Sequence, residues 1–259
     1  MNRPADPEET FLVNRLISGM DRPDTPIDRV SVGQRFVGVF AGGRLGVAST
    51  LGAAMDSHCP DVVEKLIGRP LSDASNLMVS AKSGVEISIG LAALNAGMNI
   101  PPVDASLNAG ALLKDLAQGR KAVIVGDFPF AVEIQTVASS LDLLELRPVS
   151  DSTPWDQWDK VLGDCEVAAI TSTALISRSL AYFLKATPKA VRILIGPSTP
   201  VTPLMFDQGA DILSGCRFTN PEAVMAAIER DATFREIKRA GVDLICCLRK
   251  PLDELINRN

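Results

Sequence analysis

Histidine is nearly absent from this chain, which has a single histidine, His58, among 259 residues. A metal site built from two or three histidines of one chain is therefore excluded, and only His58 could serve in a Ser-His-Asp triad. Aromatic side chains are also few, with one tyrosine and two tryptophans. The composition thus argues against histidine-based metal centres and leaves one residue for histidine-based catalysis.

Cysteines are few and scattered. The chain has five, an odd number, and no C-x-x-C pair. This spacing gives no zinc-finger or thioredoxin-like signal and argues against a disulfide framework. We therefore expect a protein of the reducing cytoplasm.

Basic runs and long apolar runs are both missing. The formal net charge is -5 and the sequence pI is about 5.0, which argues against a nucleic-acid partner or an anionic membrane surface. No stretch approaches the ~18 uninterrupted apolar residues of a transmembrane helix. Residues 1–11 are polar and acidic, so we expect no signal peptide there.

What remains is an ordinary globular composition, 46% hydrophobic and 22% charged. The length allows one to two domains at ~150 residues per domain. The first 105 residues predict an α+β domain. A helix begins at Pro7 with Asp6 as its N-cap and ends at Gly19. Two strands over residues 34–41 and 45–50 flank a Gly-Gly hairpin turn, and helices are predicted over residues 61–67 and 86–98.

The second part, residues 106–259, alternates strands and helices. This spacing predicts a parallel, doubly wound, Rossmann-like α/β sheet. The expected strands cover residues 122–125, 143–147, 167–170, 191–195, 211–213 and 242–248. The expected helices cover residues 131–140, 173–185, 205–208 and 221–230.

Ligands of such a sheet bind beyond the carboxyl ends of its strands. Four loops are expected there, at residues 126–130, 150–155, 171–173 and 196–200. The first has one glycine, Gly126, followed by Asp127 and Phe128, where a dinucleotide fold needs G-x-G-x-x-G. Because Asp127 would repel phosphate, the loop argues against NAD or FAD in the usual pose. No P-loop motif occurs.

Two of these loops are rich in hydroxyl groups and precede helices, a setting that suits a carboxylate or phosphate. An alternative is that the first merely caps its helix and the second is a rigid turn. The stiff loop between two prolines is the best functional candidate. The residues concerned are Thr171, Ser172 and Thr173, and Gly196, Pro197, Ser198 and Thr199.

Two candidate site residues stand on the apolar helix predicted over residues 86–98, whose apolar positions fall on one face. Asn95 must find partners if it is buried, so it bridges to the second domain, bonds locally or contacts a ligand. Glu86 lies at capping-box spacing from Ser83 and is either a helix-start acid or a site carboxylate.

Metal ligation has one local candidate, the adjacent pair His58 and Cys59 with Asp56 and Asp61 nearby. Because neighbouring residues seldom point at one ion, a surface or helix-entry role is the alternative. Cys246 and Cys247 lie in an apolar segment, where cysteine behaves as a small hydrophobe.

Four segments occur in an order that resembles a known family. They are GLAALNA at residues 90–96, GDFP at 126–129, ITSTAL at 170–175 and GPSTP at 196–200. Together they resemble the "putative heavy-metal chelation" family, also called domain of unknown function 364, over nearly the whole chain. The resemblance implies a Rossmann-like C-terminal domain, an enolase N-terminal-like N-terminal domain, and a bacterial or archaeal origin.

The resemblance also implies a ligand cleft between the two domains and a link to metal handling. One histidine and no clustered cysteines favour carboxylates or an organic chelator over a His/Cys cage, so the expected ligand is a small anionic metabolite or a metal chelate. Asp127 would face a cation or act as an acid/base group. Gly126, Phe128, the hydroxyl loops, Asn95 and Glu86 would contact the ligand.

Three function classes follow. The first is binding of a transition metal or metal chelate. The second is a lyase or transferase acting on a small metabolite in the same cleft. The third is a nicotinamide or flavin oxidoreductase. A homodimer is the default expectation for a chain of this size.

Overall fold

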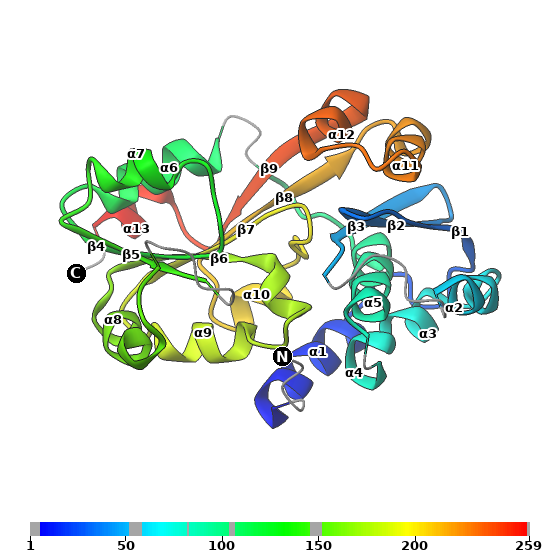
Figure 1. Ribbon diagram of the computed structural model, residues 1–259, viewed down its shortest axis with the longest axis horizontal. Helices are drawn as coiled ribbons and strands as arrows, with labels where there is room; N and C mark the ends of the chain where they lie inside the picture. The colour runs from blue at the N-terminus through cyan, green and yellow to red at the C-terminus, as the bar shows by residue number, and fades with distance from the viewer. Residues whose placement is uncertain (1–5, 52–58, 82, 104–106, 146–151, 258–259) are drawn as a thin grey trace.

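The computed structural model describes residues 6–51, 59–81, 83–103, 107–145 and 152–257 of the chain. They form two parts, each built on its own sheet (Figure 1). One sheet has three antiparallel strands and the other has six mostly parallel strands. This arrangement confirms the predicted fold class, an α/β sheet preceded by a smaller α+β unit.

The N-terminal part begins as its local sequence predicts. Asp6 accepts a hydrogen bond from the amide of Glu8 at 3.0 Å, and the first helix ends at Gly19. Gly42 and Gly43 have φ angles of +55° and +78°, as a two-residue hairpin turn requires. The elements are α1 (Pro7–Ser18), β1 (Ile27–Val32), β2 (Phe36–Ala41), β3 (Arg44–Ser49), α2 (Cys59–Leu66), α3 (Leu71–Ser75), α4 (Leu77–Ser80) and α5 (Gly84–Gly97).

Strand β1 was not predicted, because residues 21–30 are rich in turn-forming Pro and Asp. It pairs antiparallel with β2, from Ile27 opposite Ala41 to Val32 opposite Val37. The register shifts between Ile27 and Arg29. This irregularity breaks the two-residue alternation by which a strand is recognised.

Helix α5 is buried on nearly all sides, so its buried surface extends beyond the one apolar face that the sequence predicted. Eleven of its 14 residues are buried, and it packs on β3, β2 and α3. A Cβ atom on Gly46 of β3 would lie 2.0 Å from the carbonyl oxygen of Ala92, so this glycine permits the close approach. The predicted capping box is also wrong, since Ser83 makes no side-chain cap hydrogen bond.

The C-terminal part is a doubly wound sheet. Its strand order is β5-β4-β6-β7-β8-β9, with β4 to β8 parallel and β9 antiparallel to β8. Helices α6, α7 and α13 cover one face and α8, α9 and α10 the other (Figure 1). The strands are β4 (Lys121–Val125), β5 (Ser140–Leu144), β6 (Val167–Thr171), β7 (Val191–Ile195), β8 (Ile212–Phe218) and β9 (Val242–Leu248). The helices are α6 (Ala109–Ala117), α7 (Ala131–Gln135), η1 (Trp155–Gln157), α8 (Trp158–Asp164), η2 (Ser172–Leu175), α9 (Leu180–Ala186), α10 (Leu204–Asp207), α11 (Pro221–Glu229), α12 (Phe234–Gly241) and α13 (Leu252–Ile256).

Several predicted boundaries in this part are wrong. Strand β5 lies three residues earlier than the predicted 143–147, because helix α7 ends at Gln135 rather than near residue 140. The helix predicted over residues 173–185 is divided into η2 and α9, and Arg178 between them has φ +54°. Helices α6, α8, α12 and α13 were not predicted.

Helices α11 and α12 connect β8 to β9 but contact the other sheet. Helix α11 packs on β1 and β2, where a Cβ atom on Gly38 would lie 2.5 Å from the sulfur of Met225. The small sheet is thus covered by α5 and, from the C-terminal part, by α11 (Figure 1). The division into domains 1–105 and 106–259 stays a prediction.

The described helices are short, and α5 spans 14 residues. None of them has the length and apolarity needed to span a bilayer.

Candidate functional site

The candidate site lies where the direction of the strand order reverses. The chain passes from β4 to β5 on one side and then crosses to β6 on the other side of β4. The connections after β4 and β6 therefore leave toward opposite sides, and in open α/β sheets such a reversal is where ligands bind. Gly126, directly after β4, has φ +110°, and a Cβ atom there would lie 2.9 Å from Cβ of Thr171. Two of the four predicted loops, those after β4 and β6, are therefore in contact.

The loop after β6 uses its hydroxyl groups to shape itself. Thr171 Oγ1 accepts from the amide of Thr173 at 3.3 Å and lies 2.9 Å from Thr173 Oγ1. Ser172 is fully buried and donates to the carbonyl of Ile195 at the end of β7, at 3.2 Å. Thr171 is therefore the N-cap of η2, and Ser172 joins the loops after β6 and β7.

The loop after β7 is a tight turn. Gly196 has φ +132°, where a Cβ atom would lie 2.9 Å from Ser172 Oγ, and its carbonyl accepts from the amide of Thr199 at 3.1 Å. Pro197 stands between them and is partly exposed. The hydroxyls of Ser198 and Thr199 are buried rather than exposed to solvent. Thr199 Oγ1 has no hydrogen-bond partner among the described residues.

Asn95 joins this loop to the N-terminal part. Its Nδ2 donates to the carbonyls of Val47 on β3 at 3.0 Å and of Ser198 at 3.2 Å. Ser198 Oγ in turn accepts from the amide of Ser49 at 2.8 Å. Asn95 Oδ1 is buried and has no hydrogen-bond partner in the described ranges. Asn95 therefore bridges the two parts, one of the roles the sequence left open, and keeps one free acceptor.

Glu86 stands apart from this junction. It lies in the first turn of α5 and is partly exposed. Asn95 lies nine residues further along the same helix, roughly 14 Å away at 1.5 Å per residue. The structure therefore does not bring Glu86 to the Asn95–Ser198 contact.

Two carboxylates lie at the ends of β4 and β5. Asp127 is exposed, and Glu145 follows directly after Leu144. Burial raises the pKa of Glu145, and the negative charge of Asp127 raises it further. Glu145 Oε1 is buried with no partner in the part of the chain that the structure describes. Glu145 was missed because residues 143–147 were expected to be strand.

Phe128, predicted to contact the ligand, packs against Phe130 and the core. Its ring stacks on Phe130 at 5.0 Å with an interplanar angle of 17°. Both rings pack against the core that the sheet forms with α6 and α13. The aromatic pair fixes the loop that carries Asp127.

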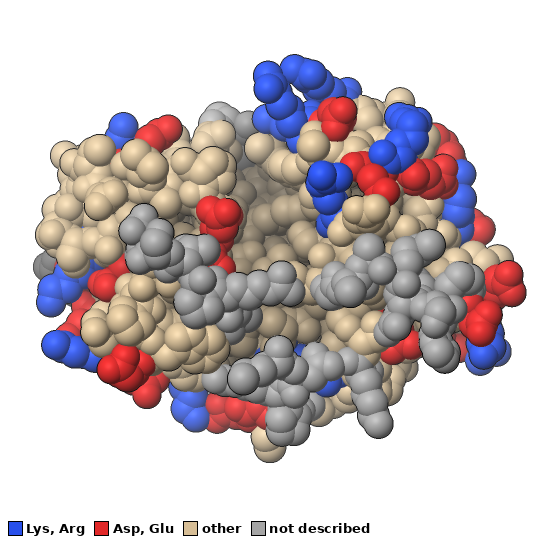
Figure 2. Space-filling view, in the orientation of Figure 1, with Lys and Arg blue, Asp and Glu red and all other residues tan. Residues whose placement is uncertain are grey.

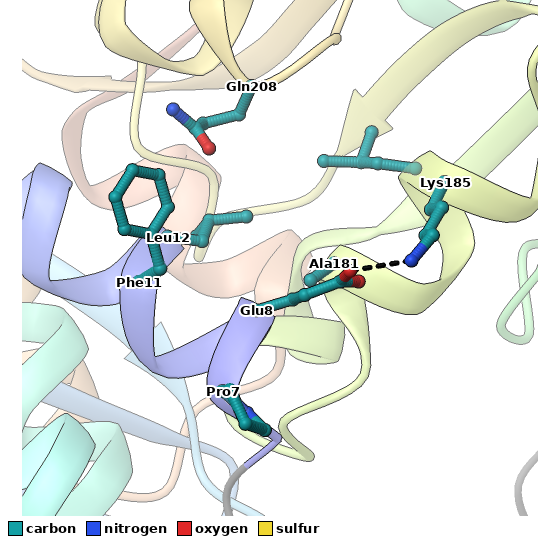
Figure 3. Close-up of a pocket in the computed structure, with 8 residues that line it drawn as sticks. Pro7, Glu8, Phe11, Leu12, Ala181, Lys185 and Gln208 are labelled. Atoms are coloured by element: carbon teal, nitrogen blue, oxygen red, sulfur yellow. Dashed lines mark hydrogen bonds and ion pairs between the residues drawn. The ribbon is translucent and has the colours of Figure 1, made fainter.

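The surface is hollowed between the two parts (Figure 2). In that view acidic side chains lie at the left rim of the hollow, and Lys and Arg gather over α12 at its upper right. Arg235, Lys238 and Arg239 of α12 are exposed. A separate pocket of about 360 Å³ lies between α1 and α9, away from the strand-end loops (Figure 3).

Comparison with family models identifies the chain. Residues 108–246 match DUF364 and residues 13–98 match DUF4213, both described as "Putative heavy-metal chelation". The chain belongs to the DUF364 family. A comparison with curated proteins gives no match.

Solved structures of DUF364 proteins share the fold. One, a protein of unknown function from Desulfitobacterium hafniense DCB-2, is 22% identical with a TM-score of 0.81. Another, from Pyrococcus horikoshii, is 16% identical with a TM-score of 0.72. In each case the match covers 93% of this chain and 98% of the other. At these identities the likeness concerns the fold alone.

The described residues of this DUF364 chain do not form a cage for a free metal ion. No group of three or more His, Cys, Asp or Glu within metal-binding reach occurs among them. Cys165, Cys216, Cys246 and Cys247 are buried and unbridged. Burial raises the pKa of Cys165 and of Cys216 to about 12, so these thiols stay protonated and are poor ligands.

The predicted local metal candidate falls largely outside the described residues. Asp56 and His58 lie there, as does the side chain of Cys59, whereas Asp61 is exposed on α2. In the predicted loop at residues 150–155, residues 150 and 151 also lie outside the described ranges.

Proposed function

We propose that this DUF364 protein binds a small anionic metabolite, or the metal complex of one, in the hollow between its two parts. The observation that carries the proposal is the junction around Ser198. There, Asn95 Oδ1 and Thr199 Oγ1 are buried and unpaired among the described residues. Each such atom costs about 1–3 kcal/mol unless it gains a partner, so a polar ligand that bonds to them would be favoured.

The charge distribution supports an anionic ligand. Lys and Arg gather over α12 beside the hollow (Figure 2). Exposed cations at the mouth of a cleft raise the local concentration of anions and the rate at which they associate. The loop amides and hydroxyls at the ends of β6 and β7 would then hold the anionic group.

The carboxylates that follow β4 and β5 support a cation within the same ligand. Asp127 and Glu145 lie close enough for one charge to raise the pKa of the other group. Two carboxylates alone make a weak site for a free transition metal, which usually takes four ligands or more. A metal that arrives with an organic chelator brings its remaining ligands with it. We therefore expect the metal as cargo, and expect binding in the cytoplasm.

The first experiment is elemental analysis of untagged protein together with native mass spectrometry. A stoichiometric metal or an unexplained added mass supports the proposal, and the same spectrum reports whether the chain forms the predicted homodimer. Calorimetry would then compare Ni²⁺, citrate and Ni²⁺–citrate as probes. We expect the complex to bind at least tenfold more tightly than either component.

Two variants test whether the ligand binds in the hollow. Asp127→Asn should weaken binding of Ni²⁺–citrate at least tenfold, whereas Asp253→Asn on α13 should leave it unchanged. Equal affinity of the wild type and Asp127→Asn, or equally tight binding of free Ni²⁺, would overturn the assignment.

A lyase or transferase acting in the same hollow is the second candidate. It is favoured by Glu145, because burial and a neighbouring carboxylate raise its pKa, the direction in which a general acid is tuned. A screen of small carboxylates and phosphates for turnover tests it. Glu145→Gln should abolish turnover and preserve binding. The oxidoreductase alternative has less support, since the Gly126 loop lacks the dinucleotide glycines, and an absorbance spectrum tests it.

A further inference from the structure

A second feature of the molecule lies on the other side of the domain junction, where α1 packs against α9. Glu9 of α1 is only 2% exposed. Its Oε2 accepts from the amide of Ala181 at 2.7 Å, and the amide of Leu180 also bonds to the carboxyl group. Glu9 thus caps α9 from a different part of the chain. Figure 3 shows the two helices side by side, with the Glu8–Lys185 ion pair at the surface.

We call the contact of α1 and α4 with α9 and the residues before it the seam. Arg178, just before α9, makes hydrogen bonds across the seam to the N-terminal part. Its Nη2 donates to the carbonyls of Met78 at 3.2 Å, Val79 at 3.1 Å and Ala81 at 2.6 Å. These carbonyls lie at the end of α4, which packs against α1. Arg178 has φ +54°, an unfavourable backbone conformation for a non-glycine residue that its contacts must offset.

Each of the two side chains keeps one buried polar atom without a partner in the described ranges. Glu9 Oε1 and Arg178 Nε are both buried and unpaired among the described residues, although the charge of Arg178 acts on Glu9. Burial raises the pKa of Glu9 to about 7, and Asp6 raises it while Arg178 and the two amides lower it.

The other charged groups on the packed elements lie nearer the surface or are already paired. On α1, Glu8 pairs with Lys185 of α9, and Arg15 is exposed. Tyr182 of α9 donates to Asp159. Helix α10 carries Asp207, and α4 has no charged residue. Glu9 is therefore the carboxyl group through which this seam responds to pH.

We propose that Glu9 and Arg178 form a clasp between the two parts of the protein, and that loss of the Glu9 proton loosens the hold of α1 on α9. The closed seam favours the protonated carboxyl group, because the ionised form leaves a charged oxygen buried without a partner. A seam that opens returns the ionised group to water. By linkage, acid tightens the seam and alkali loosens it.

The consequence for ligand binding rests on the proposed function, since a looser seam lets the two walls of the hollow move apart. The clasp itself does not depend on that function. It is measured on the ligand-free protein, so a hollow that binds nothing would leave the test below unaffected.

Tryptophan fluorescence reports on the surroundings of α9. The chain has two tryptophans, and the ring of Trp158 lies 5.8 Å from that of Phe183 on α9. We expect the emission of the wild type to change with a midpoint near pH 7. Glu9→Gln should remove the transition between pH 6 and pH 8 and keep the low-pH spectrum. Arg178→Gln should move the midpoint upward, because it removes a cation that favours the ionised carboxylate.

The control is His58→Asn, since His58 is the one histidine and histidine is the residue type whose ordinary pKa falls in this range. It should keep the wild-type midpoint. Hydrogen exchange of α9, corrected for the intrinsic pH dependence, should rise above pH 7 in the wild type and not in Glu9→Gln. A wild type without a transition between pH 5.5 and pH 8.5, or an unchanged midpoint in Glu9→Gln, would overturn the proposal.

Discussion

Asn95 and Ser198, 103 positions apart in the chain, are joined by a hydrogen bond from Nδ2 to the carbonyl oxygen at 3.2 Å. The same Nδ2 donates to Val47 on β3, so one amide holds the last turn of α5, the small sheet and the loop after β7 together. Removing it leaves two carbonyls without this donor.

Asn95→Ala should therefore destabilise the protein by about 1–3 kcal/mol. Urea denaturation followed by circular dichroism measures the change. Asn76→Ala is the matched control, since Asn76 is exposed and makes no side-chain cap bond. An equal effect of both substitutions would contradict a role for the Asn95–Ser198 contact.

Gly46 should be intolerant of any side chain. A Cβ atom there would lie 2.0 Å from the carbonyl oxygen of Ala92 and 2.3 Å from the amide of Ala96. Because both atoms are helix backbone, Gly46→Ala should cost about 3 kcal/mol or more. Gly163→Ala in α8 meets nothing within 4 Å and should stabilise by about 0.5–1 kcal/mol. Thermal unfolding of both variants checks the contrast.

Stability should fall as the pH rises through the range set by Glu9. Its pKa is raised from 4.5 to about 7 in the folded protein, so the unfolded chain loses this proton first. The free energy of unfolding that is lost by burying the ionised carboxylate is zero below pH 4.5, grows up to pH 7 and is then constant. Glu9→Gln should therefore be more stable than the wild type at pH 8, by up to about 3 kcal/mol, and equal to it at pH 4. Chemical denaturation across this range measures the difference, and a constant difference at all pH values would contradict it.

The pKa of Glu145 should depend on the charge of Asp127. Asp127 raises the pKa of Glu145, so Asp127→Asn should lower that pKa toward the usual range for glutamate. Carbon-13 NMR of the side-chain carboxyl groups follows it. Asp115→Asn on the exposed side of α6 is the control, and it should leave Glu145 unchanged.

The sequence by itself determined the local features of this protein. Asp6 and Pro7 define the first helix, Gly42 and Gly43 define the hairpin, and short apolar runs define the strands of the large sheet. Each depends on neighbouring residues, because caps, turns and strand burial act over a few positions. The family resemblance also followed from segments read in order.

Only the tertiary structure decided how these elements meet. Packing α11 on β1 and β2, placing Asn95 against Ser198 and burying Glu9 beside Ala181 all join residues far apart in the chain. Their contacts depend on the arrangement of whole elements and leave no periodic signal in the sequence. Glu145 is one example of what the sequence did not predict. The sequence placed it inside a strand over residues 143–147, but β5 lies three residues earlier, so the Glu145 carboxylate lies at the candidate site.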